Sequence, residues 1–282
     1  MAMKRFFVVF LIIGILGAIF NKQQSYAQNV NDGVYIKENI PGKRPVPYPN
    51  LREADILWTK KIWQRIDCRE KMNHPFYYPI VDMDDRRSLI SLLIYGINNE
   101  GLTAYKDDEF KELATRDEVY QMFDALPDTQ YVPNPNTGEL VQTIIEGEIK
   151  YDEVYQYEIK EQWFFDKQHS TMNIRVLGIC PIRKYIEPET GELRKKRTFW
   201  IYFPEVRPLL AGQEVFNAHN DAQRISFDDI FFQRRFSSYI TQETNVYDNR
   251  EISAYMHGLN VLQEAEKVKQ ELFEVEHDLW EF

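Results

Sequence analysis

Histidine is the side chain most often used for acid–base and metal chemistry near neutral pH. The chain holds five, and they are far apart: His74, His169, His219, His257 and His277. None has a cysteine or a second histidine at the short spacing that metal sites use. The spacing therefore predicts no metal site and no cofactor, and a site assembled from distant residues is the alternative. His74 precedes a proline and is expected to end a helix.

Asp228 and Asp229 are the clearest pair of carboxylates. Two acids that flank a glycosidic bond can hydrolyse it, so a peptidoglycan-acting enzyme is one hypothesis. Adjacent residues of a helix point about 100° apart, however. Ser226 can accept a hydrogen bond from the Asp229 backbone, and acids stabilise the first helical turn. We therefore expect both acids to start a helix. Arg234 and Arg235 follow, and pairing with nearby acids is favoured over an anion site.

The two cysteines, Cys68 and Cys180, are separated by more than a hundred residues. A disulfide is chemically possible in an oxidising compartment, but sequence cannot place the two thiols together. Two buried apolar thiols are the favoured interpretation. We expect a fold that does not need a bridge.

Aromatic residues dominate the stretch from residue 217 to 250. Phe227 and Phe231 lie one helical turn apart, as do Phe232 and Phe236, so a short helix would present a wide aromatic face. This pattern indicates packing rather than catalysis. Phe231 and Phe232 are candidate interface residues.

The first 27 residues have the features of a secretory signal peptide. Lys4 and Arg5 precede an apolar run from residue 6 to 20, and Ser25-Tyr26-Ala27 is a small-x-small cleavage site. The run is shorter than the roughly 20 residues of a membrane-spanning helix, so cleavage after Ala27 is favoured over an uncleaved anchor. We expect an exported periplasmic protein with no direct membrane span.

The chain is acidic, with 34 basic and 44 acidic residues and a net charge of −10. The signal peptide holds three of the basic residues, so the mature chain carries a net charge near −13. Nucleic-acid binding depends on neutralising phosphates, so this composition argues against it.

Residues 28–50 are predicted to form an extended arm. Four prolines block helix and central-strand pairing and favour polyproline-II backbone. Apolar residues including Tyr35 and Tyr48 interrupt the arm, which a plain linker would not need. The arm is expected to lie on its own domain or on a neighbouring subunit, and both tyrosines are candidate interface residues.

Residues 51–130 are predicted to be mainly helical. Leu51, Ala54, Trp58, Ile62 and Ile66 fall on one helical stripe, which predicts a helix from about residue 50 to 72. Two more helices are expected at residues 86–98 and 115–126, the last with a capping box at its start. The large side chains on the opposite side of the first helix are Ile56 and Trp63. Either a second layer of this protein covers them or they contact a partner.

Residues 131–254 are predicted to form an α+β part. A Pro/Asn/Gly-rich turn indicates a hairpin over residues 131–149. Alternating apolar residues from residue 163 onward indicate an antiparallel meander of at least three strands. The expected fold class is α+β: a mainly helical N-terminal half, an antiparallel β meander in the middle, and C-terminal helices.

Residues 255–282 are predicted to be a helix. Ala265, Val268 and Leu272 begin a heptad-like apolar seam with charged flanks. The helix is expected either to dock on its own core or to enter a partner's groove. Trp280 and Phe282 at the terminus favour the groove, since chain ends seldom keep large apolar groups without a partner.

Four separated segments, in order, closely resemble the PorN/GldN family of the type IX secretion and gliding-motility machinery. They are DGVY with RPVPYP, LREAD through the paired tryptophans to NHP and YYP, NDAQRISFDDIFFQRRFSSYI with NVYD, and the C-terminal EHDLWEF. The resemblance covers essentially the whole mature chain. Four multi-residue matches in order are far more specific than one short motif.

The resemblance implies a non-enzymatic periplasmic scaffold. Members of this family associate with a PorK/GldK-like outer-membrane lipoprotein, self-associate into a ring, and are thought to connect it to the PorL–PorM-like (GldM-like) inner-membrane motor. The lipoprotein would hold the chain at the outer membrane. A peptidoglycan-acting enzyme and a monomeric envelope ligand-binding protein are the alternative functions.

Overall fold

The computed structural model describes residues 42–83, 86–126, 128–133, 140–145, 147–187, 190–217, 220 and 222–280, with the backbone alone at 128–133, 140–145 and 280. The chain divides into two compact units, residues 1–38 and 39–282, and every described residue belongs to the second. The predicted signal peptide, Tyr35, Phe282 and the side chain of Trp280 lie outside this description.

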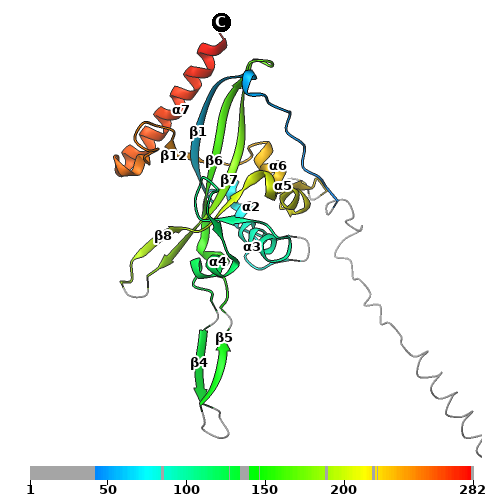
Figure 1. Cartoon of the computed structure of the whole chain (residues 1–282), viewed down its shortest axis with the longest axis vertical. Helices are drawn as coiled ribbons and strands as arrows, with labels where there is room; N and C mark the ends of the chain where they lie inside the picture. The colour runs from blue at the N-terminus through cyan, green and yellow to red at the C-terminus, as the bar shows by residue number, and fades with distance from the viewer. Residues whose placement is uncertain are drawn as a thin grey trace, which may run out of the picture. The chain divides into compact units, whose positions relative to one another are not determined.

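A large antiparallel sheet of eight strands forms the centre of this unit (Figure 1). Its order is β12-β1-β6-β7-β9-β2-β3, and β8 pairs with the far end of β7. The strands are β1 (Ile56–Asp67), β2 (Ala104–Tyr105), β3 (Leu113–Ala114), β6 (Val154–Asp166), β7 (Thr171–Ile186), β8 (Leu193–Arg197), β9 (Trp200–Tyr202) and β12 (Tyr239–Glu243). Three long strands, β1, β6 and β7, carry most of the pairing.

Two small hairpins stand outside the sheet. One joins β4 (Asp128–Pro133) to β5 (Leu140–Ile145), and the other joins β10 (Glu214–Val215) to β11 (Ile225–Ser226). The first confirms the hairpin that the turn sequence predicted, although its turn residues are not among those described.

Helices pack on the sheet or on its edge. They are α2 (His74–Tyr77), α3 (Leu89–Asn99), α4 (Arg116–Met122), α5 (Phe203–Gly212), α6 (Phe227–Phe232) and α7 (Leu259–Trp280). Single 3-10 turns are η1 (Glu53–Asp55), η2 (Lys71–Asn73), η3 (Tyr151–Glu153) and η4 (Ile252–Ala254).

The expected mainly helical N-terminal half is wrong, because its first predicted helix is the strand β1. Trp58, Ile62 and Ile66 are four residues apart, and a spacing of four fits a strand face as well as a helical stripe. Pairing with β6 on one side and β12 on the other satisfies the backbone of β1. β-branched and aromatic residues also favour the strand.

The capping boxes predicted at Thr115 and at Ser226 are confirmed. Thr115 and Glu118 form the capping box of α4. Ser226 and Asp229 form the same box at α6. Each cap joins residues three apart, so its geometry depends little on the rest of the fold.

The main hydrophobic core lies between one face of the sheet and helices α2, α3, α5 and α6. Tyr157 and Ile159 of β6 point into it, and Phe76 of α2 packs against the rings of Phe227 and Phe231 at 6.1 and 5.3 Å between ring centroids. The aromatic residues of the 217–250 stretch therefore close this core.

Helix α7 docks on its own chain. Ala265, Val268 and Leu272 are buried against Ile62 of β1 and Ile240 of β12. This supports the first of the two alternatives for the apolar seam, while the end of the helix leaves Phe273 66% exposed.

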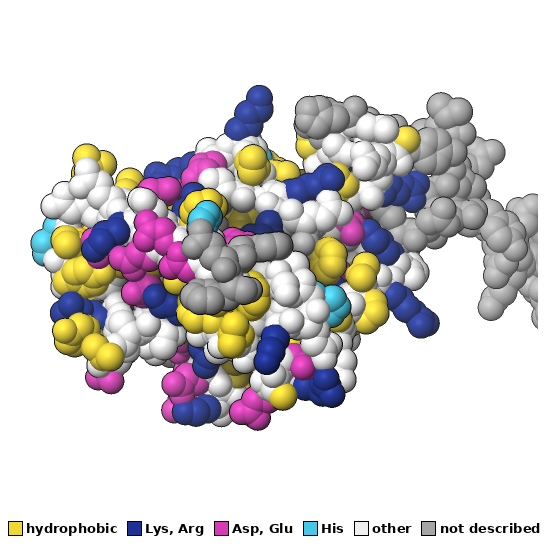
Figure 2. Space-filling model, turned by 90° about the horizontal axis from the view of Figure 1, so that it is seen from above, with side chains coloured by type: hydrophobic (Ala, Val, Ile, Leu, Met, Phe, Trp, Pro, Cys, Tyr) yellow, Lys and Arg dark blue, Asp and Glu magenta, His cyan; other side chains and the backbone are white. Residues whose placement is uncertain are grey.

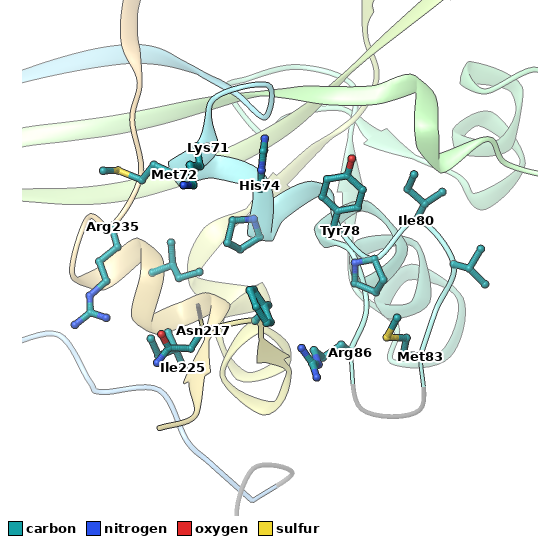
Figure 3. A pocket seen from close by; sticks show the side chains of 15 residues that line it. Lys71, Met72, His74, Tyr78, Ile80, Met83, Arg86, Asn217, Ile225 and Arg235 are labelled. Atoms are coloured by element: carbon teal, nitrogen blue, oxygen red, sulfur yellow. The ribbon is translucent and has the colours of Figure 1, made fainter. Parts of the chain in front are cut away.

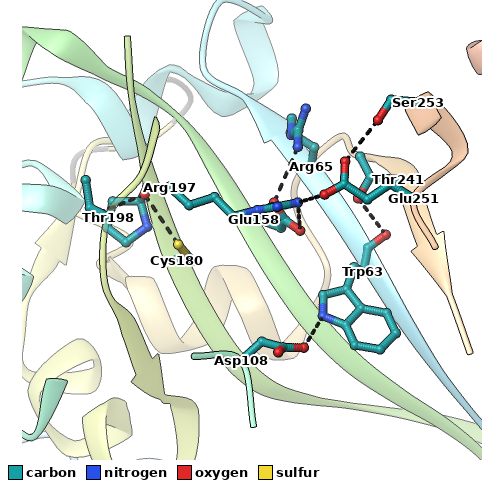
Figure 4. A network of polar contacts seen from close by, with 11 residues as sticks. Trp63, Arg65, Asp108, Glu158, Cys180, Arg197, Thr198, Thr241, Glu251 and Ser253 are labelled. Carbon is teal, nitrogen blue, oxygen red and sulfur yellow. Dashed lines mark hydrogen bonds and ion pairs between the residues drawn. The ribbon is translucent and has the colours of Figure 1, made fainter. Parts of the chain in front are cut away.

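The opposite sheet face carries a polar network (Figure 4). Glu158, which alternates with Tyr157 and Ile159, accepts hydrogen bonds from Arg197 at 2.6 and 2.8 Å, and Arg197 also pairs with Glu251. Trp63 lies on this face at 2% exposure, and its indole nitrogen donates to Asp108 at 3.1 Å. A second layer of this protein therefore covers Trp63.

Asp67, at the end of β1, should make stability depend on pH. Burial raises the pKa of its carboxyl, but hydrogen bonds from the side chain and backbone of Arg69 and from Gln156 outweigh this and lower the pKa to about 2. The carboxylate therefore stabilises the fold above its unfolded pKa of about 3.9, and this contribution is lost as pH falls towards 2.

Urea unfolding at several pH values between 6 and 2 tests this dependence. We expect Asp67→Asn to remove about 1–2 kcal/mol of stability at pH 6 and almost none at pH 2. The exposed Asp117→Asn variant is the control. An equal loss at both pH values for Asp67→Asn would contradict the assignment.

Candidate protein interface

An open apolar groove with a volume of about 1090 Å³ lies between two segments of the described chain (Figure 3). One wall is the segment from η2 through α2 to Arg86. The other wall comes from the residues around β10 and β11, with Ile230 of α6 and Arg235. The groove therefore joins parts of the chain that are more than a hundred residues apart.

The groove wall exposes large apolar side chains that the fold does not cover. Their exposed fractions are 61% for Met72, 53% for Tyr78, 42% for Ile80, 78% for Val81, 58% for Met83 and 53% for Phe216. Apolar side chains clustered in a hollow differ from the scattered ones found on any surface, and such clusters mark contacts with other molecules.

The charged side chains that line the groove are cationic. Lys71, Arg86 and Arg235 contribute, and the Arg86 guanidinium lies 5.6 Å from the centre of the Phe216 ring. No acidic residue is among the described residues that line it. Elsewhere, acidic and basic side chains are mixed on the face seen in Figure 2.

Asp228 and Asp229 have structural partners. Asp228 is buried and receives two hydrogen bonds from Arg207, from Nε to Oδ1 at 2.8 Å and from Nη2 to Oδ2 at 3.1 Å. Asp229 completes the capping box with Ser226 and pairs with Lys43. Burial raises the pKa of Asp229, but hydrogen bonds from Lys43 and Ser226 outweigh it, so its pKa is lowered. Both acids therefore hold α6 in place.

No group of three histidine, cysteine or acidic side chains that could hold a metal ion occurs in the part of the chain that the structure describes. His74 lies in the groove wall beside Tyr78, and His169 pairs with Asp166 at 2.5 Å. His219 is not among the described residues. Nor does any helix in the described segments have the length and apolar character to cross a bilayer.

The cysteines are free and buried in two different clusters. Cys68 belongs to the main core and Cys180 to the cluster around Trp63 and Trp200. Burial raises the pKa of both thiols. The favoured interpretation, two apolar thiols, agrees with this placement.

The described end of the arm, residues 42–50, lies on its own domain. Val46 accepts a hydrogen bond from Arg207 at 2.7 Å, and Pro49 accepts one from Arg175 at 2.7 Å. Tyr48 is half-buried between these two guanidinium groups, 4.2 Å from Arg207 and 5.0 Å from Arg175.

The structure places the other interface candidates separately. Phe231 is 2% exposed in the main core, whereas Phe232 is 49% exposed and stacks on Tyr48. Ile56 is half-buried at the start of β1. Trp280 ends α7. The structure does not gather these residues into one site.

Sequence reasoning missed the groove residues. The signal was the stretch YYPIVDM at residues 77–83, which has apolar residues between prolines and acids but no helical or strand period to bury them. Apolar side chains in a stretch without such a period are expected to stay partly exposed, and a cluster of exposed apolar side chains indicates a contact with a partner.

The fold and this groove define a sheet protein with a broad apolar surface of the kind that binds other proteins. The model of GldN, the gliding motility associated protein GldN, matches residues 51–281. The chain belongs to the GldN family and so to the components of gliding motility and type IX secretion. No curated protein matches the chain.

Proposed function

We propose that this protein is a non-enzymatic periplasmic scaffold of the type IX secretion and gliding machinery. In this proposal it forms a ring with a PorK/GldK-like outer-membrane lipoprotein and connects the ring to the PorL–PorM-like inner-membrane motor. The signal peptide is cleaved after Ala27, and the lipoprotein holds the chain at the outer membrane. The observation that carries the proposal is the apolar groove in a chain of the GldN family.

We assign the groove to the lipoprotein. Its apolar wall can bury a partner's apolar side chains, since six large apolar residues of the wall are exposed. Met72 and Met83 add flexible side chains that adapt to a partner's shape.

The partners of Asp228 and Asp229 weigh against a peptidoglycan-acting enzyme. A general acid or a nucleophile must reach its substrate, and Asp228 is held by Arg207 inside the fold. A monomeric ligand-binding protein would use the groove for a small molecule. Small-molecule sites enclose most of the ligand's surface, whereas this groove is open and six of its wall residues are more than 40% exposed, which weighs against that function.

Co-expression with the PorK/GldK-like lipoprotein, followed by size-exclusion chromatography, tests the proposal. We expect the two proteins to elute together as an assembly far larger than a one-to-one pair. The control is the chain expressed alone and sized at the same concentration. Elution of both proteins as separate small species would contradict the proposal.

A further inference from the structure

The hairpin of β7 and β8 carries an unfavourable concentration of positive charge. Lys184 of β7 lies directly opposite Lys195 of β8. Arg183 lies opposite Lys196, but it is buried and pairs with Glu153 and Asp124. Like charges that face each other across a sheet destabilise it. Strand β8 has the sequence LRKKR, and all five residues are exposed.

Three lysines of this hairpin have no ion pair with any described residue: Lys184, Lys195 and Lys196. The arginines beside them do have acidic partners, such as Glu187 for Arg194 at 2.8 Å. Partial desolvation of its ammonium group and the positive charges of Arg65, Lys184 and Arg69 lower the pKa of Lys195, although the residue as a whole is exposed. Lys184 and Lys195 thus form a positive patch on one face of this hairpin with which no described carboxylate pairs, and Lys196 lies on the other face.

The end of α7 has the opposite character. Its last ten residues hold Glu271, Glu274, Glu276 and Asp278 and no lysine or arginine. The C-terminal end of a helix is already negative, so acids there are unfavourable unless a cation is nearby. Glu274 and Asp278 are four residues apart and lie on one side of the helix beside the exposed Phe273. Glu271, one turn earlier, pairs with Lys267, and His277 is the basic residue of the last turn.

These two surfaces are too far apart to meet within one chain. Glu271 and Val275 lie beside Trp58 at the start of β1, and the register through β6 places Met172 at that end of β7. Lys184 is twelve residues further along β7, up to about 40 Å away. Figure 1 shows β8 and the end of α7 at different ends of the sheet.

We propose that the β7–β8 hairpin of one copy of this chain binds the acidic end of α7 of the next copy. The inference rests on the proposed function and names the contact by which copies repeat. A contact between two different surfaces is head-to-tail, and successive copies close a ring when the rotation permits. Ile186 and Leu193, 66% and 57% exposed, lie at the hairpin tip and supply apolar area.

Charge-reversal variants test the contact in the co-expressed complex with the lipoprotein. The first variant is Lys195→Glu with Lys196→Glu, and the second is Glu274→Lys with Asp278→Lys. Because the new carboxylate at position 195 faces Lys184, the first is compatible with the strand pairing. We expect each variant alone to weaken association between copies by more than about tenfold.

Combining all four substitutions in one chain restores opposite charges across the contact. We therefore expect the combined variant to form assemblies of wild-type size. The matched control is Arg116→Glu with Lys167→Glu, which makes the same charge change at two exposed positions outside both surfaces and should assemble normally.

The outcomes separate this inference from the proposed function. A small complex of chain and lipoprotein in each two-site variant, with large assemblies in the combined variant, supports the contact. Wild-type assemblies in either two-site variant, or no recovery in the combined variant, would overturn it while leaving the scaffold role intact. Failure of the wild-type chain to bind the lipoprotein would instead overturn the proposed function.

Discussion

Asp228→Ala is expected to lower the free energy of unfolding by about 3–5 kcal/mol, because it leaves a buried arginine without its carboxylate. Arg207 and Asp228 have side chains that are each 6% exposed, and two hydrogen bonds join them. Removing one partner retains the desolvation cost of the other charge and loses the attraction that offsets it. Urea unfolding measures the loss.

The same variant should loosen the arm. Arg207 also donates to the Val46 carbonyl and lies against Tyr48, so disorder of its guanidinium removes two contacts of residues 42–50. Limited proteolysis should then cut the arm faster than in the wild-type chain.

Two control variants distinguish the effect of leaving Arg207 without its carboxylate from a general loss of packing. Asp229→Ala, which removes the partner of the Ser226 cap and the more exposed pair with Lys43, should cost only about 1 kcal/mol. Arg207→Met with Asp228→Leu removes both charges and should be less destabilising than Asp228→Ala. A fully stable Asp228→Ala variant would contradict the structural role and reopen a catalytic one.

Met72→Glu with Val81→Glu is expected to weaken binding of the lipoprotein by on the order of a hundredfold, because contacts at the centre of an interface dominate its affinity. Both side chains are mostly exposed, at 61% and 78%, so the fold should lose no more than about 0.5 kcal/mol. The new carboxylates would also be costly to bury against an apolar partner surface.

A pull-down with the lipoprotein at several concentrations measures this effect, and thermal unfolding confirms that the variant is folded. The matched control is Val246→Glu, since Val246 is 90% exposed and does not line the groove. Normal lipoprotein binding by the groove variant would place that partner on another surface.

Strand β1 shows why the predicted fold class was wrong. Its apolar residues are four apart, a spacing shared by a helical stripe and a strand face, and the surrounding sequence reads equally well as helix. Whether these residues form a helix or a strand depends on whether they can pair with β6 and β12. The nearer of these two strands, β6, begins about ninety residues after β1 ends. The assignment of Ile56 and Trp63 to one side of a helix followed from the same error.

The candidate site could be predicted only in part. The sequence around Ser226 and Asp229 was enough to predict that Asp228 lies in the first turn of a helix and is not one of a pair of catalytic acids. The partner of Asp228 did not, because Arg207 belongs to another helix. The groove was missed because its two walls are joined only when α2 and β11 come together.

Local sequence alone determined the capping boxes of α4 and α6, the β4–β5 hairpin and the alternation that marks β7 as a strand, since each depends on residues within a few positions of one another. The family was also evident from ordered motifs. The tertiary structure decided the strand identity of β1, the burial of Trp63 and Phe231, and the groove. These features depend on contacts between segments that are distant in the chain. A short apolar pattern is compatible with more than one such contact, and only the assembled sheet selects one of them.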